Sequence, residues 1–142
     1  MAPRPTFLLT LALLGACVAL TLGVPCKPLN DFFQQQHLDF PKTNATDSNA
    51  YCNTMMWDRR LYFQRTHTFL NAPSEEIGRV CEEGGLASGP NQHTSRRSFP
   101  ITICSFSFWG ISYTGIATTG KLVLACCRKL PVLFVKHMQD QP

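Results

Sequence analysis

Two neighbouring runs, Gln36-His37-Leu38-Asp39 and Tyr51-Cys52-Asn53-Thr54-Met55-Met56, decide how this chain of 142 residues folds. The first run closes a stretch, Pro28–Phe40, in which apolar side chains recur at helical spacing. Phe33 and His37 are four residues apart in that stretch, so we expect them on one helix face, one turn from each other. The pattern therefore predicts a helix that carries a histidine beside its apolar side chains.

Helical signals continue to about residue 81, and strand signals follow them. We expect a second helix over residues 50–60, capped at Asp47 or the next residue, and a third over residues 71–81, capped by Asn71. Residues 82–95 are rich in Gly, Ser, Pro and Asn, which predicts a loop. Segments rich in β-branched and aromatic residues predict strands over 98–108, 111–117, 121–128 and 131–137. Helices first and strands afterwards predict an α+β domain with an antiparallel sheet.

The first 23 residues have the pattern of a secretory signal peptide. Arg4 precedes an apolar run from Phe7 to Leu22, and small residues follow, with cleavage expected after Gly23. The run is too short and too close to the N-terminus to predict a membrane span. We therefore expect a secreted, extracellular domain over residues 24–142, with no membrane span.

Six cysteines remain after residue 23, and an even number in a small secreted domain predicts a disulfide framework. Many pairings are possible, and cysteine arithmetic alone does not choose among them. No pair has the spacing of zinc ligands, and two of the cysteines are adjacent, so we expect neither a metal nor another cofactor. The six are Cys26, Cys52, Cys81, Cys104, Cys126 and Cys127.

The expected mature chain is mildly basic. Without Arg4 it has 12 Lys/Arg against 9 Asp/Glu, a net charge near +3. This charge permits an acidic partner such as RNA or heparan sulfate without requiring one, and it is low for a membrane-active cationic protein. The sequon Asn44-Ala45-Thr46 predicts a glycan on an exposed loop.

The two opening runs resemble the N-terminal third of the pancreatic-type ribonucleases, the ribonuclease A family. The resemblance implies a ribonuclease A-like fold, with three helices from the N-terminal half packed on a bent antiparallel sheet and stapled by disulfides. It extends over nearly the whole expected mature chain, through matches at Phe63–Phe69, Cys81, Ile101–Cys104, Leu124–Cys126 and Pro131–Phe134.

The resemblance also implies two disulfides, Cys52–Cys104 and Cys81–Cys126. In the chain-entropy model, each contributes on the order of 3–4 kcal/mol to stability.

Four further positions depart from the family's cysteine pattern. Phe63 and Ile111 stand where the family has two cysteines bonded to each other, and we expect their apolar packing to offset part of that lost bridge. Cys26 and Cys127 have no family counterpart. A bond between these two within the chain is weakly favoured over bonds between chains.

In this family, RNA cleavage without a metal depends on a general base, a general acid and a lysine that stabilises charge on the phosphate. His37 matches the base, whereas Gln64 stands at the lysine position and Leu133 at the second histidine. Gln64 carries no charge, and Leu133 transfers no proton. Residues that match substrate-binding positions are Gln36, Thr68 and Phe134.

Two residues are candidates for rebuilding the site. Arg65 adjoins the lysine position. His137 lies about 13 Å along an extended strand from Leu133, which is too far to serve unless the chain bends. The favoured interpretation is nevertheless a monomeric, secreted protein with little or no ribonuclease activity. It would act by binding a cell-surface protein, an acidic glycan or RNA, in host defence or reproduction.

Three alternatives stay open from the sequence. The chain could be an active, pyrimidine-preferring endoribonuclease with a rebuilt site, a cationic antimicrobial protein, or an unrelated disulfide-rich ligand.

Overall fold

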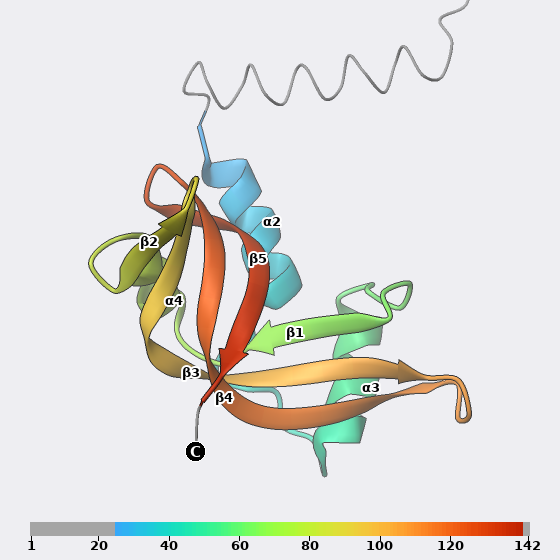
Figure 1. Ribbon diagram of the computed structural model, residues 1–142. Helices are drawn as coiled ribbons and strands as arrows, with labels where there is room; N and C mark the ends of the chain where they lie inside the picture. The colour runs from blue at the N-terminus through green and yellow to red at the C-terminus, as the bar shows by residue number, and fades with distance from the viewer. Residues whose placement is uncertain (1–24, 141–142) are drawn as a thin grey trace, which may run out of the picture.

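A computed structural model describes residues 25–140, in which helices pack against a bent, V-shaped antiparallel sheet (Figure 1). The expected signal peptide lies outside the described residues. Within 25–140, no helix is long and apolar enough to cross a membrane. The elements in chain order are α2 (Lys27–His37), α3 (Ser48–Asp58), β1 (Thr66–Leu70), α4 (Ser74–Gly78), the 3-10 turn η1 (Arg79–Cys81), β2 (Gly85–Gly89), β3 (Gln92–Ser107), β4 (Ser112–Cys127) and β5 (Leu130–Gln139).

The first two helices lie where the sequence predicts them. Helix α2 ends at His37, three residues earlier than expected, because Leu38 leaves helical geometry and pairs with Leu70 of β1. At the start of α3, the Asp47 carboxylate accepts a hydrogen bond from the backbone N–H of Ala50 at 2.8 Å, as an N-cap residue does.

The expectation that Asn71 caps the third helix is wrong. The residue before α4 is Pro73, and Asn71 is buried in a polar network instead. The Asn71 amide donates to the Tyr51 hydroxyl at 3.0 Å and accepts from the Thr102 hydroxyl at 2.7 Å. Tyr51 in turn donates to Asp39 at 2.7 Å, so the network joins the end of α2 to α3 and β3. An asparagine between two elements can cap a helix or can be buried and hydrogen-bond to other elements. The sequence alone does not distinguish these two roles.

The sheet has the order β1-β3-β4-β5, with β2 paired to the other end of β3. Strands β3 and β4 are long and pair along their lengths, so each runs through both arms of the V (Figure 1). The loop expected over residues 82–95 is wrong, because β2 and the start of β3 form a hairpin there. The break expected between residues 117 and 121 is also absent, since Gly120 pairs with Phe99 on one side and Gln139 on the other. Glycine therefore marks a bend in a continuous strand here rather than a strand end.

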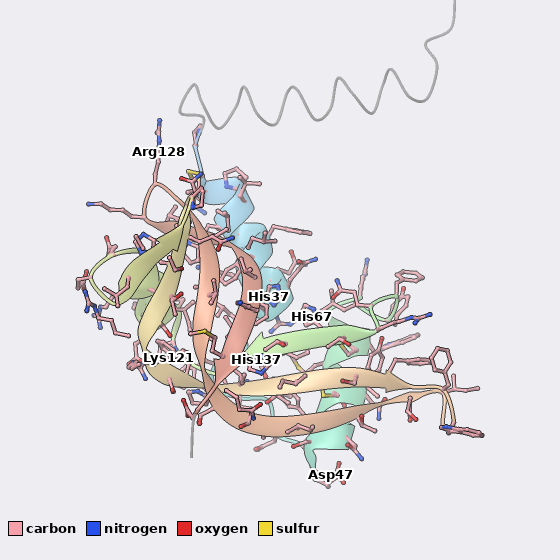
Figure 2. All side chains as sticks on the ribbon, viewed as in Figure 1. His37, Asp47, His67, Lys121, Arg128 and His137 are labelled. Carbon is pink, nitrogen blue, oxygen red and sulfur yellow. A yellow bond between two sulfur atoms is a disulfide. The ribbon has the colours of Figure 1, made fainter. Side chains whose placement is uncertain are left out.

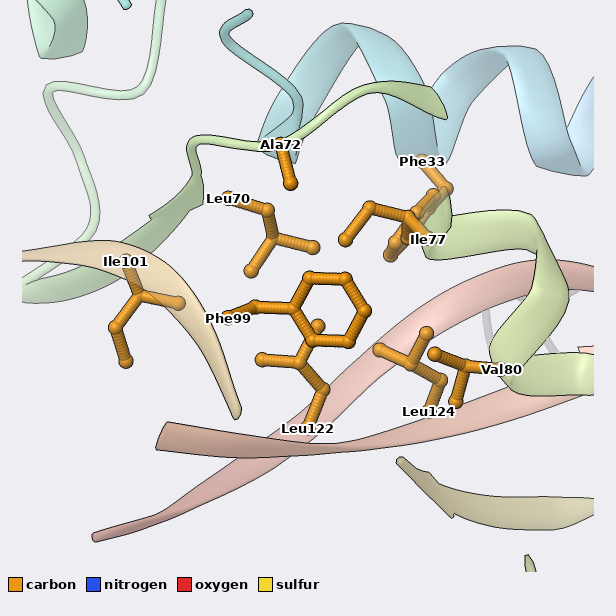
Figure 3. Packing of buried hydrophobic residues seen from close by; sticks show 9 residues of the cluster. All are labelled: Phe33, Leu70, Ala72, Ile77, Val80, Phe99, Ile101, Leu122 and Leu124. Atoms are coloured by element: carbon orange, nitrogen blue, oxygen red, sulfur yellow. The ribbon is translucent and has the colours of Figure 1, made fainter. Parts of the chain in front are cut away.

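Each arm has its own hydrophobic core. Figure 3 shows the first core, which lies where α2 and α4 cover β3 and β4. The second core lies where α3 packs against β1 and the C-terminal half of β3. Buried members of the first are Phe33, Leu70, Ala72, Ile77, Val80, Phe99, Ile101, Leu122 and Leu124. Buried members of the second are Tyr51, Cys52, Met55, Met56, Leu61, Phe69, Cys104 and Tyr113.

Three disulfides staple these layers, and they are the two pairs implied by the family resemblance together with Cys26–Cys127. Cys52–Cys104 lies in the second core, and Cys81–Cys126 joins η1 to β4 beside the first. Cys26–Cys127 ties the start of α2 to the end of β4. Their Cα–Cα distances of 5.5, 5.7 and 5.8 Å are ordinary for disulfides.

The expected packing of Phe63 and Ile111 is wrong. Their exposed fractions are 85% and 83%, so neither residue fills the space of the missing bridge. Both lie in connections that project from the sheet, Phe63 before β1 and Ile111 in the β3–β4 turn, where Ile111 has φ of 48°. The remaining disulfides and the two cores therefore hold this region without help from these side chains.

Candidate functional site

A pocket of about 370 Å³ lies where α2, β1 and β5 meet. It brings together all six residues that the sequence assigns to the site. Figure 2 shows the two histidines of this region, His37 and His67, near each other beside β5. The residues that line the pocket are Gln36, His37, Gln64, Thr66, His67, Thr68, Leu133, Phe134 and Val135.

His37 is placed by the last turn of α2 and held by β1. Its Nδ1–H donates to the backbone carbonyl of Thr68 at 2.8 Å, which leaves Nε2 as a free proton acceptor. The ring packs between Phe33 at 5.3 Å and Phe134 at 5.4 Å, measured between ring centroids. Burial lowers the pKa of His37, and the hydrogen bond to Thr68 partly opposes this. His37 is therefore oriented as a neutral base at neutral pH.

A second imidazole, His67 of β1, is the functional residue that the sequence analysis missed. It stacks on His37, with ring centroids 4.5 Å apart and an interplanar angle of 9°. Its Nε2 lies 2.7 Å from the backbone oxygen of Gln36, and its Nδ1 lies 2.7 Å from Oε1 of the Gln64 side chain. Its position in the sequence could have indicated a place in the site, because it lies between Gln64 and Thr68, two predicted site residues.

The surroundings of His67 keep it neutral. Burial, with a smaller contribution from His37, lowers its pKa to about 4. A neutral ring has one N–H, which donates from Nε2 to the Gln36 carbonyl. Nδ1 then needs a donor, and the Gln64 side chain supplies one when its amide is turned over from the Oε1 contact, so that the NH2 group faces the ring. Both ring nitrogens of His67 are thus occupied inside the protein.

The groups needed to complete a ribonuclease site are not supplied by the residues at the matching positions. Gln64 is uncharged, and His67 occupies its amide. Leu133 lies at the pocket with 58% of its surface exposed, and its side chain has no transferable proton. Arg65 does not line the pocket, because its guanidinium lies over the Phe108 ring at 5.5 Å. His137 does not line it either and pairs with Leu122 further along β5.

The lining residues include no Lys, Arg, Asp or Glu. With both imidazoles neutral, this pocket carries no formal charge at neutral pH. A phosphate entering it would meet hydrogen-bond donors but no cation. Between residues 25 and 140, no three His, Cys, Asp or Glu side chains gather as metal ligands would.

A larger cavity of about 690 Å³ lies on the other side of α2 and contains none of the residues assigned to the site. Asp31, Asp39 and Glu75 line it, and Arg59 lies 3.7 Å from the Asp39 carboxylate. This lining is acidic and disfavours phosphate, so the histidine pocket is the better candidate despite its smaller volume.

Comparison with known proteins agrees with this geometry. The family model described as "Pancreatic ribonuclease" matches residues 28–135. The "Ribonuclease" of Chelonia mydas is 35% identical over 109 residues, which cover 72% of this chain and 92% of the relative. The "Ribonuclease pancreatic" of Iguana iguana is 36% identical over 110 residues, with coverage of 72% and 92%. The crystal structure of green turtle egg white ribonuclease superposes with a TM-score of 0.73 at 32% identity, covering 78% of this chain and 98% of that one.

Proposed function

Since this chain belongs to the pancreatic ribonuclease family, we propose that it is a secreted binding protein that keeps the ribonuclease fold without cleaving RNA efficiently. One observation carries the proposal. The histidine pocket has a single free imidazole nitrogen, on His37, and neither a general acid nor a cation lies beside it.

Phosphodiester cleavage of this kind needs three contributions at one phosphate. A base removes the 2′-hydroxyl proton, an acid protonates the leaving oxygen, and a cation stabilises the added charge. His37 is placed to supply the first. The second and third are each worth roughly 10²–10⁴-fold in rate, so their joint loss removes most of the catalysis.

His67 is poorly suited to replace the missing acid. Its N–H is directed at the backbone of Gln36, away from any reacting oxygen in the pocket. Its pKa of about 4 leaves almost no imidazolium at neutral pH. The stack on His37 orients the base and adds no second proton donor.

The ligand class follows from what the site retains. Thr68 and Phe134 remain in the pocket at positions that match the family's substrate-binding residues. A base or nucleoside can be held there without strong attraction for its phosphate. We therefore propose RNA as a ligand of the pocket. The mild positive charge of the chain permits a cell-surface protein or an acidic glycan as other partners, with host defence or reproduction as the physiological settings.

One specific observation favours a second candidate, a weak endoribonuclease that relies on His37. His37 has the free Nε2 that a general base needs, and its partner bond to Thr68 is intact. Residual cleavage would then come from His37 acting alone with water as the acid.

RNA cleavage by the oxidised chain from residue 24 onward separates the two candidates, with His37→Ala as the control. We expect no activity above that control. A double variant, Leu133→His with Gln64→Lys, should gain activity at least about 10²-fold above the parent chain, because it restores an acid and a cation. Cleavage by the parent chain that disappears in His37→Ala would refute the proposal.

A further inference from the structure

One end of the molecule exposes an unusual number of large apolar side chains. We call this set the aromatic end, and Trp109 at its tip is 100% exposed. Single exposed apolar residues are ordinary, but several large ones at one end of a molecule are characteristic of an interaction site. Its members are Trp57, Tyr62, Phe63, Phe108, Trp109 and Ile111.

Two connections form the aromatic end. The last turn of α3 and the segment after it carry Trp57, Tyr62 and Phe63, and the β3–β4 turn carries Phe108 to Ile111. In Figure 1 both connections project from the same end of the molecule, away from β2 and the β4–β5 turn. The two segments come from opposite halves of the sequence and meet only through the fold.

Specific contacts join these connections. The backbone N–H of Phe106 donates to the Arg65 carbonyl at 2.7 Å, and the Arg65 guanidinium covers the Phe108 ring. The Tyr113 hydroxyl donates to the Gln64 carbonyl at 2.6 Å. The base of the β3–β4 turn is therefore fixed to the segment before β1, while the tip stays open.

The three rings on the α3 side of this end pack on one another without entering either core. Trp57 and Tyr62 have centroids 5.3 Å apart, and Tyr62 and Phe63 are 4.7 Å apart. None of the three belongs to the buried clusters. Core packing therefore gives no reason for these side chains, and an external partner does.

The charge pattern identifies the partner's chemistry. Residues 105–120, which contain the whole tip, include no charged side chain. Arg60 and Arg65 lie at the other connection, with Asp58 as the one acid in the stretch 57–65. An uncharged aromatic tip beside arginines suits an anionic lipid surface, where aromatic rings lie among the headgroups and guanidinium groups face phosphates.

We propose that the aromatic end docks peripherally on an anionic lipid surface, with Phe108, Trp109 and Ile111 entering the headgroup region. The modest net charge of the whole chain does not oppose this, because the local arrangement of charge and aromatic area decides interfacial binding. A single-stranded nucleic acid fits less well. It binds in grooves whose cations follow the backbone, whereas this tip is an uncharged turn. The proposal is independent of whether the histidine pocket cleaves RNA.

The chain's two tryptophans make the test direct. In a Trp57→Phe variant of the oxidised protein, Trp109 is the single remaining indole. Its fluorescence is followed while vesicles of phosphatidylcholine, with or without phosphatidylserine, are added. We expect a blue shift with the anionic vesicles, quenching by shallow brominated lipids, and co-sedimentation that weakens as salt is raised.

Matched variants assign the effect to the surface. Trp109→Ser should weaken co-sedimentation with anionic vesicles by at least about tenfold, and Arg65→Gln should reduce the preference for phosphatidylserine. Leu86→Ser removes an exposed apolar side chain from β2, remote from the aromatic end, and should change nothing. All four positions are exposed, so circular dichroism should show native folding in each variant.

Three results would overturn the proposal. One is an unchanged Trp109 emission with anionic vesicles. Another is vesicle binding that Trp109→Ser leaves intact. The third is a blue shift produced by single-stranded RNA but not by vesicles, which would make the aromatic end a nucleic-acid surface instead.

Discussion

Acidification should destabilise this protein through His67. The folded state favours the neutral ring, so its pKa in the fold is about 4, against 6.5 for an unperturbed histidine. Between those values the unfolded chain binds more protons than the folded chain, and the free energy of unfolding falls as pH falls. The contribution of His67 is intact above about pH 6.5 and is lost as pH drops to about 4.

The size of the effect follows from the shift. A difference of one pKa unit corresponds to about 1.4 kcal/mol, so this shift gives roughly 3 kcal/mol at full protonation and somewhat less at about pH 4.5. Burial lowers the pKa of His37 as well, so protonation of His37 acts in the same direction. A loss of this size is a large fraction of the stability of a small domain.

Urea unfolding at about pH 7 and about pH 4.5 measures the loss, and His67→Gln provides the control. Glutamine places its side-chain NH2 group where the imidazole has Nε2, so it retains an N–H donor for the Gln36 carbonyl but does not titrate. The parent protein should lose about 2–3 kcal/mol more than the variant between the two pH values, because carboxylates elsewhere titrate equally in both proteins. Equal losses, or a His67 proton resonance that titrates near pH 6.5, would show that the described environment of the ring is wrong.

Three further changes test the framework around the site. Leu124→Ala opens a cavity in the first core and should cost about 2–5 kcal/mol in urea unfolding, while a loss under 1 kcal/mol would contradict the packing. Asn71→Ala leaves Thr102 and Tyr51 short of partners and should cost about 1–3 kcal/mol, and an unchanged thermal midpoint would argue against the network. Replacing Cys26 and Cys127 together by serine frees a loop with a sequence separation of 101 and should cost up to about 4–5 kcal/mol. A double serine variant as stable as the parent would show that the bridge adds nothing.

Local patterns predicted the helices and the family well. Apolar spacing located α2 to within a few residues, and the predicted cap at Asp47 located α3 equally well. Such features depend on neighbours one turn away, which the sequence shows directly. The family motifs, once joined, implied the Cys52–Cys104 and Cys81–Cys126 pairs that the structure contains.

Features that depend on distant partners were predicted poorly. The segment 82–95 has loop composition, yet part of it pairs as a hairpin, since pairing depends on β3 as well as on its own residues. Phe63 and Ile111 are apolar but exposed, because burial requires a surface to cover them and the fold offers none there.

The candidate site shows the same division. Motif matching located His37, Gln64 and Leu133 in one pocket. It did not find His67, whose importance comes from a stack with a helix 30 residues earlier in the chain. A histidine in a strand has no sequence signature for the ring that it will face.

The histidine stack also sits on the boundary between the two cores. His37 contacts Phe33 and Phe134 of the first core, and His67 contacts Phe69 of the second at 4.8 Å. The arms share β3 and β4, so a small twist of those strands would slide one imidazole across the other. The ring-current contributions to the NMR chemical shifts of the two histidines therefore report the angle between the two arms of the sheet. These shifts would show whether that angle changes when a ligand binds in the pocket or when the aromatic end binds a lipid surface.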